Sequence, residues 1–269
     1  MGRIISFKTA FLAPLMLISP LNLWLPSIEI CFSTIIDNTL SYKCNNLFMT
    51  HDINIHIETD HESASTYLVS EIKHLRNKVN SKFSIGLSGG NTPKLAYSKM
   101  LESFVDFADI NFWTVDERWV DDKNEFSNQK LIDSYFDKTD ANILKFEFSN
   151  KSPYDDAMKY EDKLKDNIDI YDVVILGLGE DGHIASLFPG TEALENNDFL
   201  YTANEVNIKT KWRVTSTYKL LGSVRKIFVL ATGTNKKNIL SLVNKNETLP
   251  INILKNYSNN IEIITDQII

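Results

Sequence analysis

Apolar residues recur at two different spacings along the chain from Ile53 onward, and these spacings predict strands and helices. Isoleucines alternate with polar residues over 53–57, as in a half-buried strand. Over 64–79 apolar residues return every three or four positions, which places them on one face of a helix. The apolar run 83–87 predicts a second strand. After it, Thr92 is expected to cap the next helix, with Pro93 in the first helical position.

The same alternation of strand and helix patterns continues to the end of the chain. Further strands are predicted at 110–115, 143–148, 171–176, 227–231 and 261–264, and helices at 127–136, after Pro153 and near 235–243. The run YDVVIL at 171–176 is the densest in apolar residues, which is typical of a central strand buried on both faces. Strands that alternate with helices predict an α/β fold: a mainly parallel, Rossmann-like sheet with helices on both faces.

Residues 1–48 follow a different pattern and form a hydrophobic extension. Residues 9–28 carry no charge, a length that suits a membrane span, but three prolines among them each remove a helix hydrogen bond. Three explanations are open: a membrane anchor, a signal peptide, or an extension that precedes a true start at Met49. Residues 49–269 contain no repeat or linker, and we expect them to form a single catalytic α/β domain.

Composition and charge narrow the class of function. The chain has 28 Lys and Arg against 35 Asp and Glu, a formal net charge of −7, which argues against a nucleic-acid partner. Both cysteines, Cys31 and Cys44, lie in the extension, so residues 45–269 contain no thiol. A cysteine nucleophile, a thiolate zinc site and a disulfide framework are thereby excluded from the predicted domain. We expect this domain to act in the cytoplasm without binding a membrane.

Polar clusters stand at the carboxyl ends of three predicted strands. SGG at 88–90, DER at 116–118 and GLGEDGH at 177–183 each follow an apolar run. In open α/β sheets, ligands bind beyond the carboxyl ends of the strands. The three clusters therefore predict one binding site at this edge of the sheet.

The segment GLSGGNTP at 86–93 has more than one interpretation. Its glycines let the backbone approach a ligand, and N–H groups at a helix start favour an anion; the simpler interpretation is a tight strand-to-helix turn. GLSGG also matches the nucleophile elbow of serine esterases, with Asp116 and His183 following in the order of a catalytic triad. Against a triad, Ser88 is expected in a loop before the helix. His183 also follows a middle strand, with at least one strand-helix unit still to come, whereas the histidine of these hydrolases usually comes late in the chain.

His183 is the main catalytic candidate. The segment 177–183 contains G-x-G-x-x-G, but its two acidic residues would repel a pyrophosphate, so we expect no nicotinamide cofactor. An imidazole here can accept a proton from water near neutral pH, with Asp181 or Asp116 to orient it. No second His or Cys lies nearby in the sequence, so we expect no metal site. The other histidines are expected at the surface: His51, His56, His61 and His74.

Three basic residues are candidates for binding an anion. Arg118 follows a strand end, Lys236 follows a Thr-Gly pair after another strand, and Arg213 opens RVTST before an apolar helix. Each alone is typical of a solvated surface charge. Arg213 stands beside two threonines and is expected to hold a phosphate, because a guanidinium forms paired hydrogen bonds with phosphate oxygens.

Five segments, taken in order, resemble the 6-phosphogluconolactonase family. They are SGGNTP at 88–93, TVDERWV at 114–120, SNQKL at 127–131, GLGEDGHIASLFPG at 177–190 and RVTST at 213–217. The glucosamine-6-phosphate deaminases share this family's fold and first glycine-rich loop, but they have an asparagine-glutamate-proline turn where SLFPG stands here at 186–190. The hydrophobic extension departs from the family pattern.

The resemblance implies hydrolysis of 6-phospho-D-glucono-1,5-lactone to 6-phosphogluconate in the pentose phosphate pathway, with no cofactor and no metal. His183 matches the family's general base. The matched substrate-contact positions are Gly89, Gly90, Asn91, Thr92, Arg118, Arg213 and Lys236. We expect Ser88 and Asp116 to lie beside them. We also expect Asp181 next to the base, and Gly179 in a loop whose N–H groups stabilise the oxyanion.

Other functions remain as alternatives. A deaminase or isomerase on the same fold would release ammonia from glucosamine 6-phosphate or interconvert an aldose and a ketose. A serine esterase would react with an organophosphate at Ser88. A non-catalytic sugar-phosphate sensor would bind its ligand and keep its function without His183. The sequence predicts no oligomeric state.

Overall fold

The computed structural model describes residues 29–36, 39–46, 52–208 and 210–269, with side chains from Asp52 onward. The chain divides into two compact units, Met1–Met49 and Thr50–Ile269. In the first unit, β1 (Glu29–Ile36) pairs antiparallel with β2 (Thr39–Asn46). The uncharged segment 9–28, Met49, His51 and the side chains of Cys31 and Cys44 lie outside the described residues.

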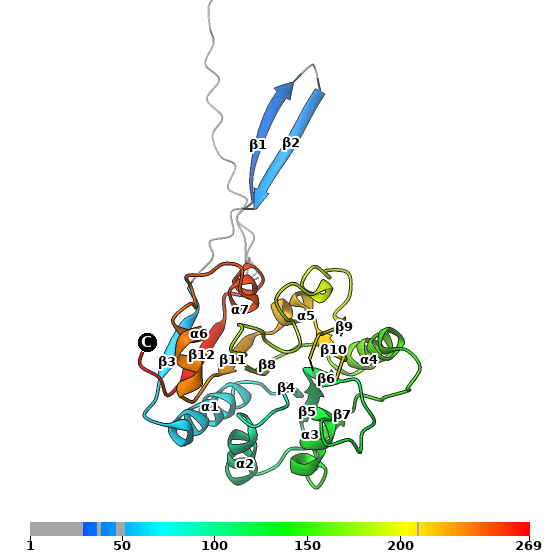
Figure 1. Ribbon diagram of the computed structural model, residues 1–269, viewed down its shortest axis with the longest axis vertical. Helices are drawn as coiled ribbons and strands as arrows, with labels where there is room; N and C mark the ends of the chain where they lie inside the picture. Colours follow the sequence, from blue (N-terminus) through cyan, green and yellow to red (C-terminus); the bar gives the residue numbers. More distant parts are fainter. Residues whose placement is uncertain (1–28, 37–38, 47–51, 209) are drawn as a thin grey trace, which may run out of the picture. The chain divides into compact units, whose positions relative to one another are not determined.

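In the described part of the second unit, seven strands form one parallel sheet (Figure 1). Their order across the sheet is β3 (Asn54–Ile57), β12 (Ile261–Thr265), β11 (Lys226–Leu230), β8 (Val173–Gly177), β4 (Phe83–Leu87), β5 (Ile110–Thr114) and β7 (Asn142–Leu144). Every neighbouring pair is parallel, so the carboxyl ends of the strands share one edge. The central strand is β8, as the apolar run at 171–176 predicted.

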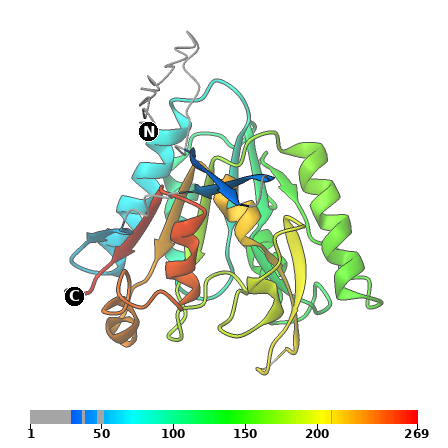
Figure 2. The same cartoon turned by 90° about the horizontal axis from the view of Figure 1, so that it is seen from above.

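Side chains of this sheet alternate between two apolar layers. On β8, Val173 and Ile175 belong to one layer, and Val174 and Leu176 to the other. The first layer is covered by α1 (His61–Arg76), α2 (Lys94–Ser103) and α3 (Asn128–Phe136), which Figure 1 shows together below the strands. The second is covered by α4 (Pro153–Asn167), α5 (Tyr218–Ser223), α6 (Lys237–Leu240) and α7 (Pro250–Ile253) (Figure 2). The predicted α/β fold with helices on both faces is confirmed.

Side-chain oxygens cap α1, α3 and α4 at their starts. Asp60, Ser127 and Ser152 each accept the backbone N–H three residues further on, at 2.7, 3.0 and 3.2 Å. Such a cap satisfies one of the N–H groups that the first turn of a helix leaves unpaired. Among the described residues no helix is both long and apolar enough to cross a membrane.

The start of α2 differs from the prediction. The helix begins at Lys94, and the Pro93 carbonyl accepts the Tyr97 N–H at 3.0 Å. Thr92 does not cap the helix, because a turn closed by the Lys94 N–H on the Asn91 carbonyl (3.3 Å) comes between the glycine loop and the first helical turn. The predicted capping role of Thr92 is therefore wrong, although the helix itself is present.

Two further boundaries also differ from the predicted ones. The strand expected at 143–148 ends at Leu144 as β7, because the Phe146 N–H donates to the Gln129 side chain at 3.0 Å and not to a neighbouring strand. The helix expected near 235–243 is shorter, since a 3₁₀ turn (Thr234–Lys236) precedes the four residues of α6. Further 3₁₀ turns span Glu192–Leu194 and Leu254–Asn256.

A small antiparallel sheet stands beside the parallel one and was not predicted. Within the described residues it contains β6 (Asp116–Arg118), β10 (Trp212–Ser216) and β9 (Tyr201–Glu205), with β10 in the middle. Its register places Arg213 opposite Arg118, and Thr215 opposite Asp116. The segments DER and RVTST, which are far apart in the sequence, are therefore neighbours in one ladder.

Candidate active site

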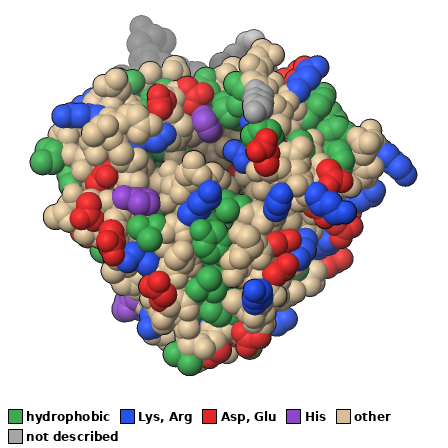
Figure 3. Space-filling model, turned by 60° about the horizontal axis from the view of Figure 1, so that its bottom comes forward, with side chains coloured by type: hydrophobic (Ala, Val, Ile, Leu, Met, Phe, Trp, Pro, Cys, Tyr) green, Lys and Arg blue, Asp and Glu red, His purple; other side chains and the backbone are tan. Residues whose placement is uncertain are grey.

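A cavity of about 210 Å³ opens at the carboxyl edge of the parallel sheet. Its walls come from the segments that follow β4, β5, β8 and β11, whose carboxyl ends meet at this edge. The lining residues are 88–93, Asp116, Arg118, Asn128, 177–179, His183, Ala185 and Lys236. Figure 3 shows a hollowed face bordered by histidine and by Lys or Arg side chains. All of the predicted site residues except Asp181 and Arg213 line the cavity.

The first glycine-rich loop lines this cavity and contains several unpaired backbone N–H groups. Within the described chain, no acceptor pairs with the N–H groups of Gly89, Gly90, Asn91 and Thr92. Gly90 has a φ of 88°, a conformation that glycine adopts without strain. A run of unpaired N–H groups of this kind can bind an anion such as a phosphate.

Ser88 does not have the surroundings of a nucleophile. Its side chain is buried, and its Oγ donates to the Ile175 carbonyl at 2.7 Å. The Tyr97 hydroxyl donates to the Ser88 carbonyl at 2.6 Å, which fixes the residue further. Among the described residues no hydrogen bond joins Ser88 to His183, so the serine-triad alternative lacks its central contact.

Glycines shape the second loop, between β8 and His183. Gly182 has a φ of 83°, and its N–H donates to the Gly179 carbonyl at 3.1 Å. The Gly179 N–H donates to the His183 carbonyl at 2.8 Å. A side chain at Gly179 would overlap both the His183 imidazole and the Asp181 carboxylate. The tight loop therefore requires glycine at 179 in order to place the histidine.

Two N–H groups of this loop are unavailable to a ligand. Those of Gly179 and Gly182 are used inside the loop, which removes them from the set expected to stabilise an oxyanion. The N–H groups of Leu178 and Glu180 have no acceptor in the described part of the chain. Leu178 lines the cavity and Glu180 does not, so the Leu178 N–H is the stronger candidate for stabilising an oxyanion there.

The imidazole of His183 is held at one edge and on one face. Its Nδ1 lies 2.6 Å from Asp181 Oδ1, which also accepts the His183 backbone N–H at 3.1 Å. The ring of Phe188 stacks on it, with centroids 4.1 Å apart. When Nδ1–H donates to the carboxylate, Nε2 keeps its lone pair, and no described residue bonds to it. The side chain is 30% exposed, so a water molecule can reach it.

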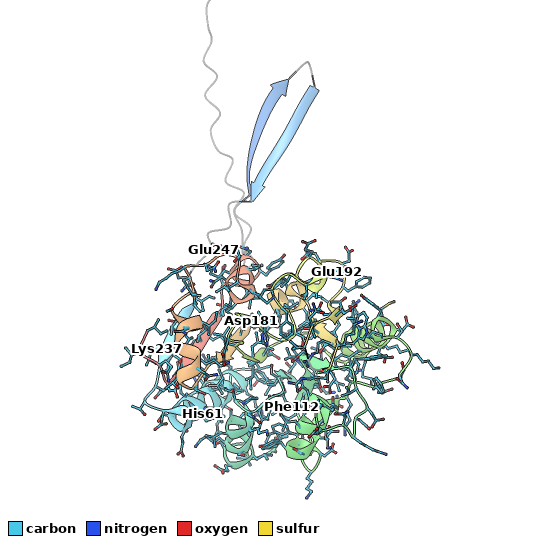
Figure 4. All side chains as sticks on the ribbon, viewed as in Figure 1. His61, Phe112, Asp181, Glu192, Lys237 and Glu247 are labelled. Atoms are coloured by element: carbon cyan, nitrogen blue, oxygen red, sulfur yellow. The ribbon has the colours of Figure 1, made fainter. Side chains whose placement is uncertain are left out.

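Asp181, and not Asp116, is the carboxylate that contacts the His183 imidazole. Burial raises the pKa of Asp181, but the charge and hydrogen bonds of His183 lower it further, so its net pKa lies below the usual value. Asp181 is therefore ionised at neutral pH and can stabilise an imidazolium. In Figure 4, Asp181 lies between Lys237 on one side and Glu192 on the other.

Asp116 connects β6 to the segment that follows His183. It is buried, and its Oδ2 accepts the Ser186 hydroxyl at 2.6 Å. The backbone of Ser186 is fixed as well, because its N–H donates to Thr215 Oγ1 (3.1 Å) and its carbonyl accepts from Asn204 Nδ2 (2.8 Å). These bonds hold the segment after His183 against the small sheet. In this segment, Ala185 has a φ of 50°.

Glu117 is 1% exposed and bonds to the backbone of two cavity residues, Arg118 and Asn128. Its carboxylate accepts the backbone N–H groups of Arg118 (2.7 Å), Asn128 (2.6 Å) and Gln129 (2.7 Å), and the Ser127 hydroxyl at 3.1 Å. Burial raises the pKa of Glu117 to about 7, although the three backbone hydrogen bonds act in the opposite direction. Glu117 thus joins β6 to the first turn of α3.

Two of the three predicted cations face the cavity. Arg118 and Lys236 line it, and neither forms an ion pair with a described acidic residue. Arg213 lies on β10 opposite Arg118, is 6% exposed, and is not among the lining residues. Burial lowers the pKa of Arg213 to about 10, against the opposing effect of Asp116, and the residue stays charged at neutral pH.

Asn128 lines the cavity and was not predicted as a site residue. Its side chain accepts from Arg118 Nη1 at 2.6 Å and donates to the Asp116 carbonyl at 2.7 Å. It follows Ser127, the residue that caps α3. The sequence signal was present in SNQKL at 127–131, but a polar residue in the first turn of a helix is ordinarily explained by solvent exposure.

The other described histidines lie away from this cavity. His74 is exposed, His56 stacks on Tyr67, and His61 Nδ1 lies 2.8 Å from Thr232 Oγ1. The last two are partly exposed, in agreement with the surface positions predicted for them. In residues 52–208 and 210–269 no three His, Cys, Asp or Glu side chains are grouped as a metal site requires.

The fold and the cavity define an α/β protein whose site unites a carboxylate-bound histidine, cations and free backbone N–H groups at the carboxyl edge of a parallel sheet. This chain belongs to the family described as glucosamine-6-phosphate isomerases/6-phosphogluconolactonase, whose model matches residues 59–263. The family that the sequence motifs predicted is confirmed.

Individual relatives agree with this assignment. The chain is 34% identical to the 6-phosphogluconolactonase of Synechocystis sp. (58% of this chain, 69% of the relative) and 33% identical to that of Nostoc sp. (62% and 73%). The crystal structure of 6-phosphogluconolactonase from Thermotoga maritima is similar with a TM-score of 0.69 at 26% identity, over 79% of this chain and 98% of that one. The fold is also that of the Trypanosoma cruzi 6-phosphogluconolactonase (TM-score 0.73, 24% identity, 81% and 95% covered).

Proposed function

We propose that this protein is a lactone hydrolase that converts 6-phospho-D-glucono-1,5-lactone to 6-phosphogluconate. The observation that carries the proposal is a His183 imidazole oriented by Asp181, exposed to a cavity that also contains cations and unpaired N–H groups. The names of the relatives support the substrate, and the site supplies a base for water and a place for a phosphate. The phosphorylated sugar lactone is the partner that this chemistry requires.

His183 acts as the general base in this proposal. Nε2 removes a proton from a water molecule as its oxygen attacks C1 of the lactone, and a tetrahedral oxyanion forms. The ionised Asp181 stabilises the imidazolium through Nδ1–H. When the C1–ring oxygen bond breaks, the imidazolium returns the proton to the departing oxygen, so the product is the open-chain acid and the histidine is neutral again.

Backbone N–H groups stabilise the developing negative charge on the C1 oxygen. The loop 177–182 supplies them, through Leu178 and Glu180, because Gly179 and Gly182 are bonded within the loop. A preorganised donor at an oxyanion contributes about 10²–10³-fold to turnover in other hydrolases. No step of this mechanism passes through a metal or a cofactor.

The phosphate is bound at the opposite side of the site. Arg118, Lys236 and the N–H groups of the loop 88–92 provide positive charge and donors on the cavity wall. Arg213 adds its charge from the position opposite Arg118 in the β10–β6 ladder. Binding energy from this remote group positions C1 beside the water and the imidazole.

We also propose that residues 49–269 are the catalytic domain and act in the cytoplasm. Every residue described in the cavity belongs to this range. The proposed substrate carries a phosphate whose charge keeps it in the compartment where it is made, and the enzyme must share that compartment.

The decisive experiment follows acid release from freshly prepared phosphogluconolactone above its spontaneous hydrolysis. We expect the purified full chain to accelerate the reaction and His183→Ala to lower kcat by at least about 10²-fold, because the base is lost. His74→Ala, on an exposed histidine of α1, is the matched control and should leave kcat unchanged. Near-normal turnover in His183→Ala would remove it as the base. Ammonia release from glucosamine 6-phosphate without lactone hydrolysis would identify a deaminase instead.

A further inference from the structure

Asn128 is the first residue of α3 and connects three segments of the cavity wall. Its side chain is 1% exposed and reaches Arg118 and Asp116 on β6. It also packs against Gly89 so closely that a Cβ at position 89 would overlap the Asn128 amide. One side chain thus contacts the phosphate-loop glycine, a cavity carboxylate residue and a cavity cation.

The hydrogen bonds of Asn128 fix the orientation of its amide. Oδ1 accepts from Arg118 Nη1 at 2.6 Å, and a guanidinium offers only donors, so the oxygen must face it. Nδ2 donates to the Asp116 carbonyl at 2.7 Å and lies 3.4 Å from Asp116 Oδ1, both of which are acceptors. The flipped amide would place donor against donor and acceptor against acceptor.

The backbone of Asn128 is anchored as firmly as its side chain. Its N–H donates to Glu117 Oε1 at 2.6 Å, on the same strand that carries Arg118. The Phe126 carbonyl gives the Arg118 guanidinium a second acceptor, at 3.0 Å from Nη1. The guanidinium is therefore held by the loop that leads into α3 and not by an acidic partner, which leaves its charge available to an anion.

We propose that Asn128 is a positioning residue that aims the Arg118 guanidinium at the substrate phosphate. It acts through Arg118 and does not bind substrate itself, because both polar atoms of its amide are already used by protein groups. The proposal rests on the phosphate-binding role given to Arg118 above. A substitution should then weaken binding of the phosphorylated substrate more than it slows the chemical step at His183.

Gln129, the next residue on α3, provides a matched control. It is also buried, and its backbone N–H also donates to Glu117, at 2.7 Å. Its side chain turns away from the cavity and accepts from Thr114 Oγ1 (2.8 Å) and the Phe146 N–H (3.0 Å). A merely structural role for this turn of α3 predicts similar effects from both residues, whereas positioning of Arg118 predicts an effect from Asn128 alone.

The test compares Asn128→Ala, Gln129→Ala, Arg118→Ala and the double variant Asn128→Ala/Arg118→Ala in the full chain. We expect Asn128→Ala to raise KM for the phosphorylated lactone about tenfold, with kcat within about threefold of wild type. Gln129→Ala should lower the melting temperature and leave KM unchanged. In the Arg118→Ala background, Asn128→Ala should raise KM no further, because the group that it positions is gone.

Two results would overturn the positioning role. One is an Asn128→Ala variant that loses thermal stability like Gln129→Ala while KM stays at the wild-type value. The other is a double variant whose KM increase equals the product of the increases in Asn128→Ala and Arg118→Ala, because the two residues would then act independently. A wild-type protein that does not hydrolyse the lactone would contradict the proposed function but not, by itself, the role of Asn128. Calorimetric binding of 6-phosphogluconate to the same four variants would still decide the role of Asn128, with Kd in place of KM.

Discussion

At the scale of single residues, the missing side chain of Gly179 determines where the His183 imidazole can lie. The ring occupies the space that a Cβ at position 179 would fill, and the Asp181 carboxylate borders the same space. The Phe188 ring covers one face of the imidazole. The His183 imidazole is therefore located by a packing constraint as well as by its hydrogen bond to Asp181.

We predict that Gly179→Ala lowers kcat by about 10²-fold, because a methyl group there displaces the imidazole, and a shift of about 1 Å in a reacting group can cost that factor. Gly190→Ala is the control: Gly190 has a positive φ, 74°, which Gly179 does not, and no atom lies within 4 Å of its added Cβ. The control should lose stability through backbone strain and keep its kcat. Equal kcat values for the two variants would contradict the packing constraint.

Most cavity residues could be predicted from the sequence because they directly follow apolar strands. His183 and Gly90 stand where a parallel sheet ends, so position alone marks them. Asn128 could not be found in this way, since it follows a loop and begins a helix. Arg213 was expected at the phosphate; it lies on a buried strand, opposite Arg118 in the ladder, and does not line the cavity.

At the scale of elements, the first turn of α3 depends on a buried carboxyl group. Glu117 accepts the N–H groups that start this helix, and it also bonds the backbone of β6. Burial raises its pKa from 4.5 to about 7, so between these values the folded protein binds a proton that the unfolded chain does not. The contribution of Glu117 to the free energy of unfolding therefore falls as the pH rises through this window.

The raised pKa of Glu117 predicts how the stability of the protein depends on pH. Relative to Glu117→Gln, which does not titrate, the wild type should lose on the order of 1 kcal/mol of unfolding free energy per pH unit between pH 5 and 7. Denaturant unfolding of both proteins at several pH values measures the difference. Glu192→Gln, on an exposed carboxyl, should follow the wild-type curve. Parallel curves for wild type and Glu117→Gln would contradict a raised pKa at this carboxyl.

The parallel sheet could be predicted from the sequence, whereas the antiparallel one could not. Strands such as β4 and β8 consist of short apolar runs between helices. In β9 and β10 apolar and polar residues alternate over only a few positions, and polar residues such as Thr202 and Thr215 are buried through side-chain hydrogen bonds, so neither strand shows an apolar run. Polar residues that are buried by hydrogen bonding do not add to the hydrophobic pattern from which a strand is predicted.

At the scale of the whole molecule, the cores and the site belong to one unit. In the described residues, both apolar layers and every residue that lines the cavity lie within Thr50–Ile269. We predict that a chain of residues 49–269 has the kcat and KM of the full chain and melts within about 2 °C of it. We expect removal of residues 1–48 to change the free energy of unfolding by no more than ~1 kcal/mol, which corresponds to a shift of that size in a domain of this length. A loss of activity or of cooperative unfolding in the shortened chain would contradict the independence of this unit.

The cavity takes its lining from positions as distant as Ser88 and Lys236. Residues this far apart leave the ribosome at different times, so a nascent chain gains no help from its substrate until nearly the whole unit has emerged. The proposed function implies that bound sugar phosphate stabilises the complete protein, by about 2.7 kcal/mol at a ligand concentration one hundred times Kd. The amount of intact enzyme in a cell should then rise and fall with the metabolite supply.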